Sequence, residues 1–187
     1  MTTALDQQRV TLKNLKVADF ASQETLCFSA TVVFDGEAIA EANNDGHGGA
    51  TYLYAREGKR DRLDEAEAFA ASLPPEVTEF DDPQDSSRRF TIDFTLEYLV
   101  DSLAIVMHED RRIRASFNRH MASKVMYVRD GKLMYLKNVK LKTVTDRADL
   151  FARLRARHPE PITILAELPA DEAFTLWKRL AVDDGES

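Results

Sequence analysis

The chain has 187 residues, of which 44% are apolar and 30% are charged, as expected for a globular protein with a real core. No apolar run approaches the roughly 20 residues that cross a bilayer, and the first residues lack a secretory pattern. A single cysteine excludes an internal disulfide framework and a cysteine-based zinc site. We therefore expect a cytoplasmic protein, without membrane contact, that forms one domain over residues 1–187.

The net charge of −7 conceals an uneven distribution along the chain. Residues 1–110 carry −13, residues 111–157 carry +11, and residues 158–187 carry −5. The middle segment contains fourteen Lys or Arg residues and only three acidic ones. This asymmetry indicates two electrostatically distinct surfaces and charged partners.

The first 55 residues show the period-two alternation of half-buried strands. Asp35 and Gly36 predict a two-residue hairpin turn, because glycine accepts positive φ at low cost. The N-terminal part is therefore predicted to be an antiparallel sheet, with strands at residues 9–17, 24–34, 37–42 and 50–55.

The period then changes from two to that of a helix. Residues 61–73 predict a helix that ends before Pro74 and Pro75. Residues 74–89 are acidic and proline-interrupted, which predicts a connection that is either mobile or functional. Residues 91–121 predict one long central helix, continuous through "HEDRR" at 108–112 because no Gly or Pro interrupts it.

The C-terminal part predicts a hairpin followed by short elements. In residues 124–137, Asp130 and Gly131 form the expected turn, which places Tyr127 opposite Met134 and Met126 opposite Tyr135. The remaining elements are a strand at 139–144, a helix capped by Asp146, an extended segment at 161–168, a closing helix after Pro169, and a frayed tail at 183–187. Strands and helices that occur in runs predict an α+β fold: an N-terminal antiparallel sheet, a long central helix, and a C-terminal β-hairpin with two short helices.

The segment "NNDGHGGA" at 43–50 holds three of the seven glycines around His47. It is interpreted first as a strand connection, because the flanking segments predict strands and glycine permits positive φ. A loop that contacts a partner or ligand, and a small hydrolase or transferase centred on Asp45 and His47, are the alternatives. No metal site is expected, because no second histidine lies within a helical turn of His47.

Two other residues receive structural interpretations. His108, beside Glu109 and Asp110, is expected on a solvated, ion-paired helix face, because adjacent residues of a helix point in different directions. Cys27 is expected to be a small packed residue, because no histidine lies near it in the sequence. No cofactor and no catalytic residue are assigned.

The basic segment, residues 111–157, allows a nucleic-acid interface as an alternative function. Lys and Arg would contact phosphates, and two tyrosines of the hairpin would stack on bases. The candidate residues are Arg111, Arg112, Arg119, Lys124, Tyr127, Arg129, Tyr135 and Lys137. The opposing interpretation is that this segment neutralises the acidic part of the same chain, since the overall pI of 5.2 is low for such a domain.

The acidic regions support a different prediction, namely contact with a basic groove on another protein. The partner-binding candidates are Asp81, Asp82 and Asp85 in the acidic connection, together with Asp45 and His47 in the glycine loop. A merely solubilising surface is the alternative.

Three segments carry a resemblance: "KVADFASQETLCFSATVVFDGEAIAEANNDGHGGA", "VMYVRDGKLMYLK" and "ILAELPADEAF". They resemble a family of small uncharacterised proteins of phages and bacterial mobile elements, from about residue 10 to residue 180. The resemblance implies an accessory role, such as binding a host protein or ribonucleoprotein and inhibiting a defence system, for example a CRISPR effector. We therefore expect a non-enzymatic interaction protein.

Overall fold

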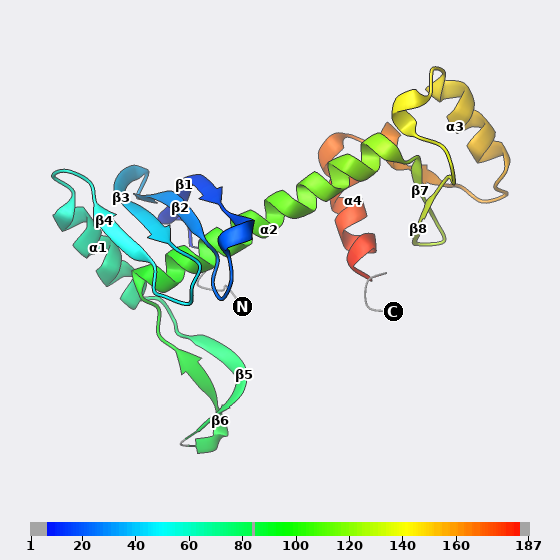
Figure 1. The fold of residues 1–187 in the computed structure, drawn as a ribbon. Helices are drawn as coiled ribbons and strands as arrows, with labels where there is room; N and C mark the ends of the chain where they lie inside the picture. Colours follow the sequence, from blue (N-terminus) through cyan, green and yellow to red (C-terminus); the bar gives the residue numbers. More distant parts are fainter. Residues whose placement is uncertain (1–6, 84, 184–187) are drawn as a thin grey trace. The chain divides into compact units, whose positions relative to one another are not determined.

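The structure is a computed structural model that describes residues 7–83 and 85–183 (Figure 1). The chain groups into two compact units, Met1–His108 and Glu109–Ser187. The predicted α+β class is confirmed, with an N-terminal antiparallel sheet, a long helix, and C-terminal strands and helices. Cooperativity of folding decides whether two units make one domain, so the expected single domain stays a prediction.

The first unit is built on a four-stranded antiparallel sheet in the order β1-β2-β3-β4. Its strands are β1 (Val10–Val17), β2 (Phe28–Phe34), β3 (Glu37–Asn44) and β4 (Tyr52–Ala55). The predicted hairpin turn is confirmed, with φ of 50° at Asp35 and 84° at Gly36. Each of the four predicted strands is present, although β2 begins four residues later than expected.

The late start of β2 has a local cause. Residues 18–27 form a connection that contains the short 3₁₀-helix η2 (Asp19–Ala21). Three of their backbone N–H groups donate to the glycine loop rather than to a strand. The N–H groups of Gln23, Glu24 and Thr25 all point to the carbonyl of Gly46, at 3.0, 3.0 and 3.4 Å. Because these donors are directed to the glycine loop, they are not available to a neighbouring strand.

One face of the sheet packs on α1 (Arg60–Ala71) and on the first half of α2 (Leu96–Ser123). The largest side chains in this core are fully buried and come from the sheet and both helices: Phe34, Ile39, Leu63, Leu96 and Leu99. Each buried Leu or Phe contributes about 1.5–3 kcal/mol relative to exposure. This burial holds the sheet and the two helices together as one core.

Residues 76–92 differ from the expectation. Instead of an irregular connection, β5 (Glu76–Asp82) and β6 (Asp85–Ile92) pair as an antiparallel ribbon. Figure 1 shows this ribbon extending away from the four-stranded sheet. Since residues 85–92 pair in the ribbon, α2 begins at Leu96 rather than at 91, where the hydroxyl of Thr95 accepts a 3.2 Å hydrogen bond from the N–H of Tyr98.

The helix α2 is continuous through residues 108–112, as predicted. No helix among the described residues is both long enough and apolar enough to cross a bilayer.

The second unit contains a three-stranded antiparallel sheet in the order β8-β7-β9. Its strands are β7 (Met126–Arg129), β8 (Lys132–Tyr135) and β9 (Thr163–Ile164). The predicted hairpin register is confirmed, with Tyr127 opposite Met134 and Met126 opposite Tyr135. The two helices are α3 (Arg147–Ala156) and α4 (Ala170–Asp183).

The side chain of Asp146 caps α3, as predicted, by accepting a 2.9 Å hydrogen bond from the N–H of Asp149. The strand expected at 139–144 is wrong: Leu141–Thr143 form a 3₁₀ turn, η3, closed by the N–H of Thr143 on the carbonyl of Lys140. The short 3₁₀-helix η4 (Leu165–Glu167) follows β9. Of the expected frayed tail, Asp183 ends α4, and 184–187 lie outside the described residues.

Candidate functional site

The glycine loop connects β3 to β4, so the interpretation as a strand connection is confirmed. Asn44, only 3% exposed, organises the loop from within. Its amide oxygen accepts from the hydroxyl of Thr25 and the N–H of Gly46, both at 2.9 Å. Its amide nitrogen donates to the carbonyl of Gly49 at 3.0 Å and to the hydroxyl of Thr51 at 3.1 Å. The loop is therefore held by a buried asparagine and not by the histidine.

Gly46 explains why the loop requires glycine. Its φ is +86°, and a Cβ there would collide with the carbonyl oxygen of Ala21 and approach Cβ of Cys27 at 2.8 Å. The close approach lets the Gly46 carbonyl receive the three N–H groups of residues 23–25. The glycine at this position therefore allows the backbone of the β3–β4 loop to pack directly against the backbone of residues 18–27.

Asp45 and His47 are both exposed. The Asp45 carboxylate accepts a 3.2 Å hydrogen bond from the backbone N–H of His47, which is an Asx turn rather than a contact between the two side chains. A general base needs an orienting partner for its imidazole, and a metal needs several ligands. Within residues 7–83 and 85–183 no cluster of three His, Cys, Asp or Glu side chains is arranged for a metal. This geometry gives no support to a hydrolase or transferase.

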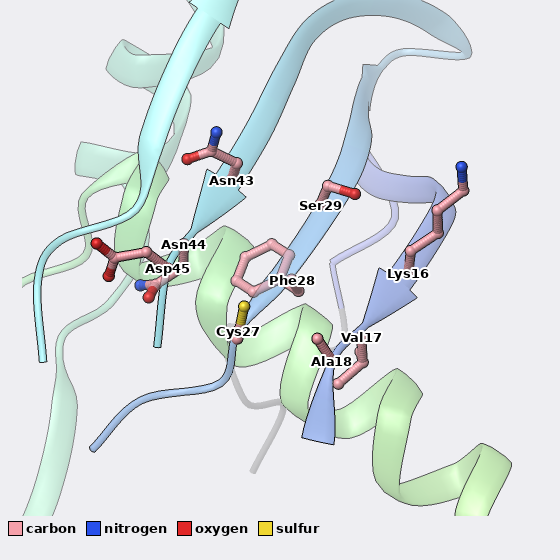
Figure 2. Close-up of a pocket in the computed structure, with 9 residues that line it drawn as sticks. All are labelled: Lys16, Val17, Ala18, Cys27, Phe28, Ser29, Asn43, Asn44 and Asp45. Carbon is pink, nitrogen blue, oxygen red and sulfur yellow. The ribbon is translucent and has the colours of Figure 1, made fainter. Parts of the chain in front are cut away.

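A shallow hollow of about 360 Å³ lies at the end of the sheet beside this loop. Figure 2 shows its polar side chains, Lys16, Ser29 and Asn43, projecting from β1, β2 and β3. Cys27 and Asp45 line the same hollow, which contains no histidine to activate the thiol. The arrangement suits binding of a polar group rather than nucleophilic catalysis.

The structure shows the contacts made by the helix face at residues 108–110 of α2. Nε2 of His108 lies 2.9 Å from Oδ1 of Asp19, and the His108 side chain is 14% exposed, which is more buried than the expected solvated position. Asp110 pairs with Nζ of Lys178 on α4 at 3.2 Å. Both are structural contacts within their own units.

The three acidic partner-binding candidates lie together at the tip of the β5–β6 ribbon. Asp81 is opposite Arg89, which donates to its carboxylate at 2.7 Å, and Asp82 is opposite Asp85. Hydrogen bonds from the hydroxyl and the N–H of Ser87 hold the pKa of Asp85 below its usual value. Asp45 and His47 lie on a different element, so the five candidates form two separate sets.

The ribbon also exposes apolar side chains, which the sequence did not single out. Val77 is 64% exposed, Phe80 67% and Phe90 42%. Isolated two-stranded ribbons are marginally stable in water, and exposed phenylalanine in such a ribbon is unfavourable. Carboxylates and unburied rings therefore occur on the same small element.

The basic candidates do not form one stacking surface. Residues paired across an antiparallel ladder share a face, so Tyr127 and Tyr135 lie on opposite faces of the β7–β8 hairpin. Tyr127 is 6% exposed, with its ring 5.4 Å from that of His158, and cannot stack on a base. Tyr135 is 52% exposed, and the ammonium of Lys124 lies 4.7 Å from its ring centre.

Several basic side chains of the segment have acidic neighbours. Arg129 lies 3.4 Å from Asp130, and Arg153 lies 2.6 Å from Asp149. Arg155 pairs with Glu167 and Arg114 with Asp171. The remaining candidates are Arg111, Arg112 and Arg119 on α2 and Lys137 after β8. None of these four is aromatic, so Tyr135 is the exposed one of the two candidate stacking rings. Nucleic-acid binding through this segment stays a prediction.

Sequence reasoning missed two features of the first unit. Tyr52 and Tyr54 on β4 are 57% and 59% exposed, with ring centres 6.5 Å apart. Their alternation with Leu53 and Ala55 was a signal that could have shown a shared outward face. Asp101 on α2 accepts a hydrogen bond from Thr51, and burial raises its pKa above the usual value.

No protein-family model, curated protein or solved structure matches this chain, so the evidence for function lies in the geometry of the chain itself.

Proposed function

We propose that this chain is a non-enzymatic interaction protein that docks its β5–β6 ribbon on a basic groove of a protein partner. The observation that carries the proposal is the ribbon's combination of exposed Val77, Phe80 and Phe90 with carboxylates at its tip. The ribbon, residues 76–92, contains five acidic and two basic residues.

The two kinds of side chain act differently in such a complex. Burying each exposed phenylalanine would contribute about 1.5–3 kcal/mol of binding free energy, before the cost of association. The carboxylates would accelerate encounter with a basic surface and select against acidic ones. A groove lined by Lys and Arg with an apolar pocket is the surface that satisfies both requirements.

The proposed class of partner is a host protein or ribonucleoprotein that binds nucleic acid. Effector complexes that hold nucleic acid in a positively charged channel, such as a CRISPR effector, present this chemistry. The sequence resemblance to proteins of phages and mobile elements also supports a host defence complex as the partner. Occupation of the channel by the ribbon would inhibit the effector without any chemical step.

Affinity capture from a bacterial host lysate tests the proposal with the wild-type chain and three full-length variants. The ribbon variants are Asp81→Ala/Asp82→Ala/Asp85→Ala and Val77→Ser/Phe80→Ser, and the charge-matched control is Glu57→Ala/Glu109→Ala/Glu160→Ala. We expect wild type and control to retain the same nucleic-acid-binding proteins, with at least tenfold less retained by either ribbon variant, and heparin to displace them.

The captured protein is then purified and its affinity for each form is measured by calorimetry. Equal affinity for wild type and both ribbon variants would contradict the proposal. Binding that heparin does not weaken would contradict the basic groove in particular.

A further inference from the structure

The face of the four-stranded sheet opposite α1 and α2 has a distinct composition. Residues paired across the strands project from the same face. One row across the sheet is Lys16, Ser29, Asn43 and Tyr52, and the adjacent row is Lys13, Thr31, Glu41 and Tyr54. The face therefore has lysines along one edge, tyrosines along the other, and hydrogen-bonding side chains between them. This surface, defined by the two rows, is called the outer face below.

The tyrosine edge offers two stacking surfaces. Tyr52 and Tyr54 are more than half exposed, and their rings are nearly parallel at 28° with centres 6.5 Å apart. An exposed aromatic ring on a sheet provides a flat apolar surface on which a base can stack. Two such rings on one strand can hold two bases of the same strand of nucleic acid.

The lysine edge provides positive charge at a suitable distance. Lys13 and Lys16 are exposed, and neither has an ion-pair partner within the part of the chain that the structure describes. Three strand spacings of about 4.8 Å separate β1 from β4, and long lysine side chains shorten this gap. Phosphates of a strand whose bases stack on the tyrosines can therefore reach the ammonium groups.

The centre of the outer face is neutral or hydrogen-bonding. Glu41 accepts a 3.1 Å hydrogen bond from the hydroxyl of Thr31 and lies 3.7 Å from Arg56, which offsets its charge. Ser29 and Asn43 line the hollow of about 360 Å³ beside Lys16. They are placed to bond to sugar or base-edge groups between the stacked bases and the phosphates.

We propose that the outer face binds single-stranded nucleic acid, with two bases on Tyr52 and Tyr54 and phosphates at Lys13 and Lys16. A duplex is disfavoured because its bases are stacked on one another and present no free ring face. The first unit as a whole is acidic, so its long-range attraction for nucleic acid is weak. This proposal is independent of the ribbon and its partner.

The test is fluorescence anisotropy of labelled twelve-nucleotide oligo(dT) and oligo(U) with the full chain at 50 and 200 mM salt. We expect Tyr52→Ala/Tyr54→Ala to weaken binding at least tenfold, and Tyr52→Phe/Tyr54→Phe to bind like the wild type. We expect Lys13→Ala/Lys16→Ala to reduce the slope of log affinity against log salt by about 1.4, because each phosphate contact on a single strand contributes about 0.7.

The matched control is Tyr135→Ala/Lys137→Ala in the second unit, which should bind like the wild type. Thermal melting checks that all variants fold. The proposal is overturned if no single strand binds at 50 mM salt, if duplex DNA binds equally well, or if the control loses binding while the outer-face variants retain it. The last result would assign binding to the basic segment instead.

Discussion

At the scale of single residues, Asn44 and Gly46 determine the shape of the glycine loop, and His47 does not. The Asn44 side chain makes four hydrogen bonds while almost fully buried, and loss of a buried partner costs about 1–3 kcal/mol. Gly46 lets two connections approach more closely than any side chain would permit. His47 lies outside this network except through its backbone N–H. The loop is therefore a structural junction.

Gly46→Ala is expected to destabilise the protein by at least about 2 kcal/mol, because it adds both a positive-φ penalty and a steric clash with Ala21. Chemical denaturation measures the change in unfolding free energy. The matched control is Gly49→Ala, since a Cβ there meets nothing within 4 Å and φ is not positive. Equal stability of the two variants would show that the close approach does not matter.

At the scale of elements, the contact between α2 and the segment that leads into β4 includes a half-buried acid, Asp101. The hydroxyl of Thr51, the residue before β4, donates to the Asp101 carboxylate on α2. Burial raises the pKa of Asp101, the hydrogen bond from Thr51 opposes this, and Glu97 adds to it. A raised folded-state pKa means that folding disfavours the ionised form. The resulting destabilisation is absent below the unfolded pKa near 3.8 and complete above the folded pKa.

Asp101→Asn should therefore gain stability relative to wild type as pH rises from 3 to 7, while its amide oxygen can still accept from Thr51. Urea denaturation of both proteins at a series of pH values gives this difference and cancels the other titrating groups. Asp101→Ala, which removes the acceptor, controls for loss of the hydrogen bond. A difference that does not change with pH would contradict the role of the charge.

The ribbon is the element whose existence the sequence did not predict. Its strands are rich in charged and polar residues, contain no clean alternation, and are separated by a turn that contains Pro83. The pairing is also irregular, with register shifts between Val77 and Asp82. The irregular pairing and the exposed apolar side chains of the ribbon agree with its proposed role as a contact element.

At the scale of the whole chain, charge is divided between the two units. Residues 1–108 carry a net charge of −11 and residues 109–187 carry +4. The ribbon and the outer face belong to the first unit, and the basic segment lies in the second. Trp177, the one tryptophan of the chain, lies in the core of the second unit, so its fluorescence reports on the folding of that unit.

The second unit is expected to lose stability on mild acidification. His120 packs with its ring centre 5.7 Å from that of Trp177, and burial, with Lys124 and Arg119, lowers its pKa below 6.5. A depressed pKa of a base means that the unfolded state binds the proton more readily. Stability therefore falls as pH drops from the unfolded pKa of about 6.5 through the folded pKa.

Trp177 fluorescence during urea titration at pH 7.5 and pH 5 measures this loss. His120→Gln should show a smaller loss between the two pH values, because the neutral side chain cannot be protonated. An identical pH dependence in wild type and variant would assign the effect to other groups.

The elements whose signals are local could be predicted from the amino-acid sequence alone. The DG turns at Asp35 and Asp130, the alternation of the first strands, the cap at Asp146 and the uninterrupted α2 all depend on neighbours within a few residues. Local dihedral preferences and the periods of helix and strand are sufficient for such features. The register of the β7–β8 hairpin followed from its turn in the same way.

Which side chains share a surface could be seen only in the tertiary structure. It buried Tyr127 while leaving Tyr135 exposed, placed the three carboxylates at a ribbon tip beside unburied rings, and aligned Lys16 with Tyr52 across four strands. The tertiary structure also showed that the glycine loop is hydrogen-bonded to residues 18–27 through the carbonyl of Gly46. Such associations depend on pairing between distant segments, which composition and period in one sequence do not encode.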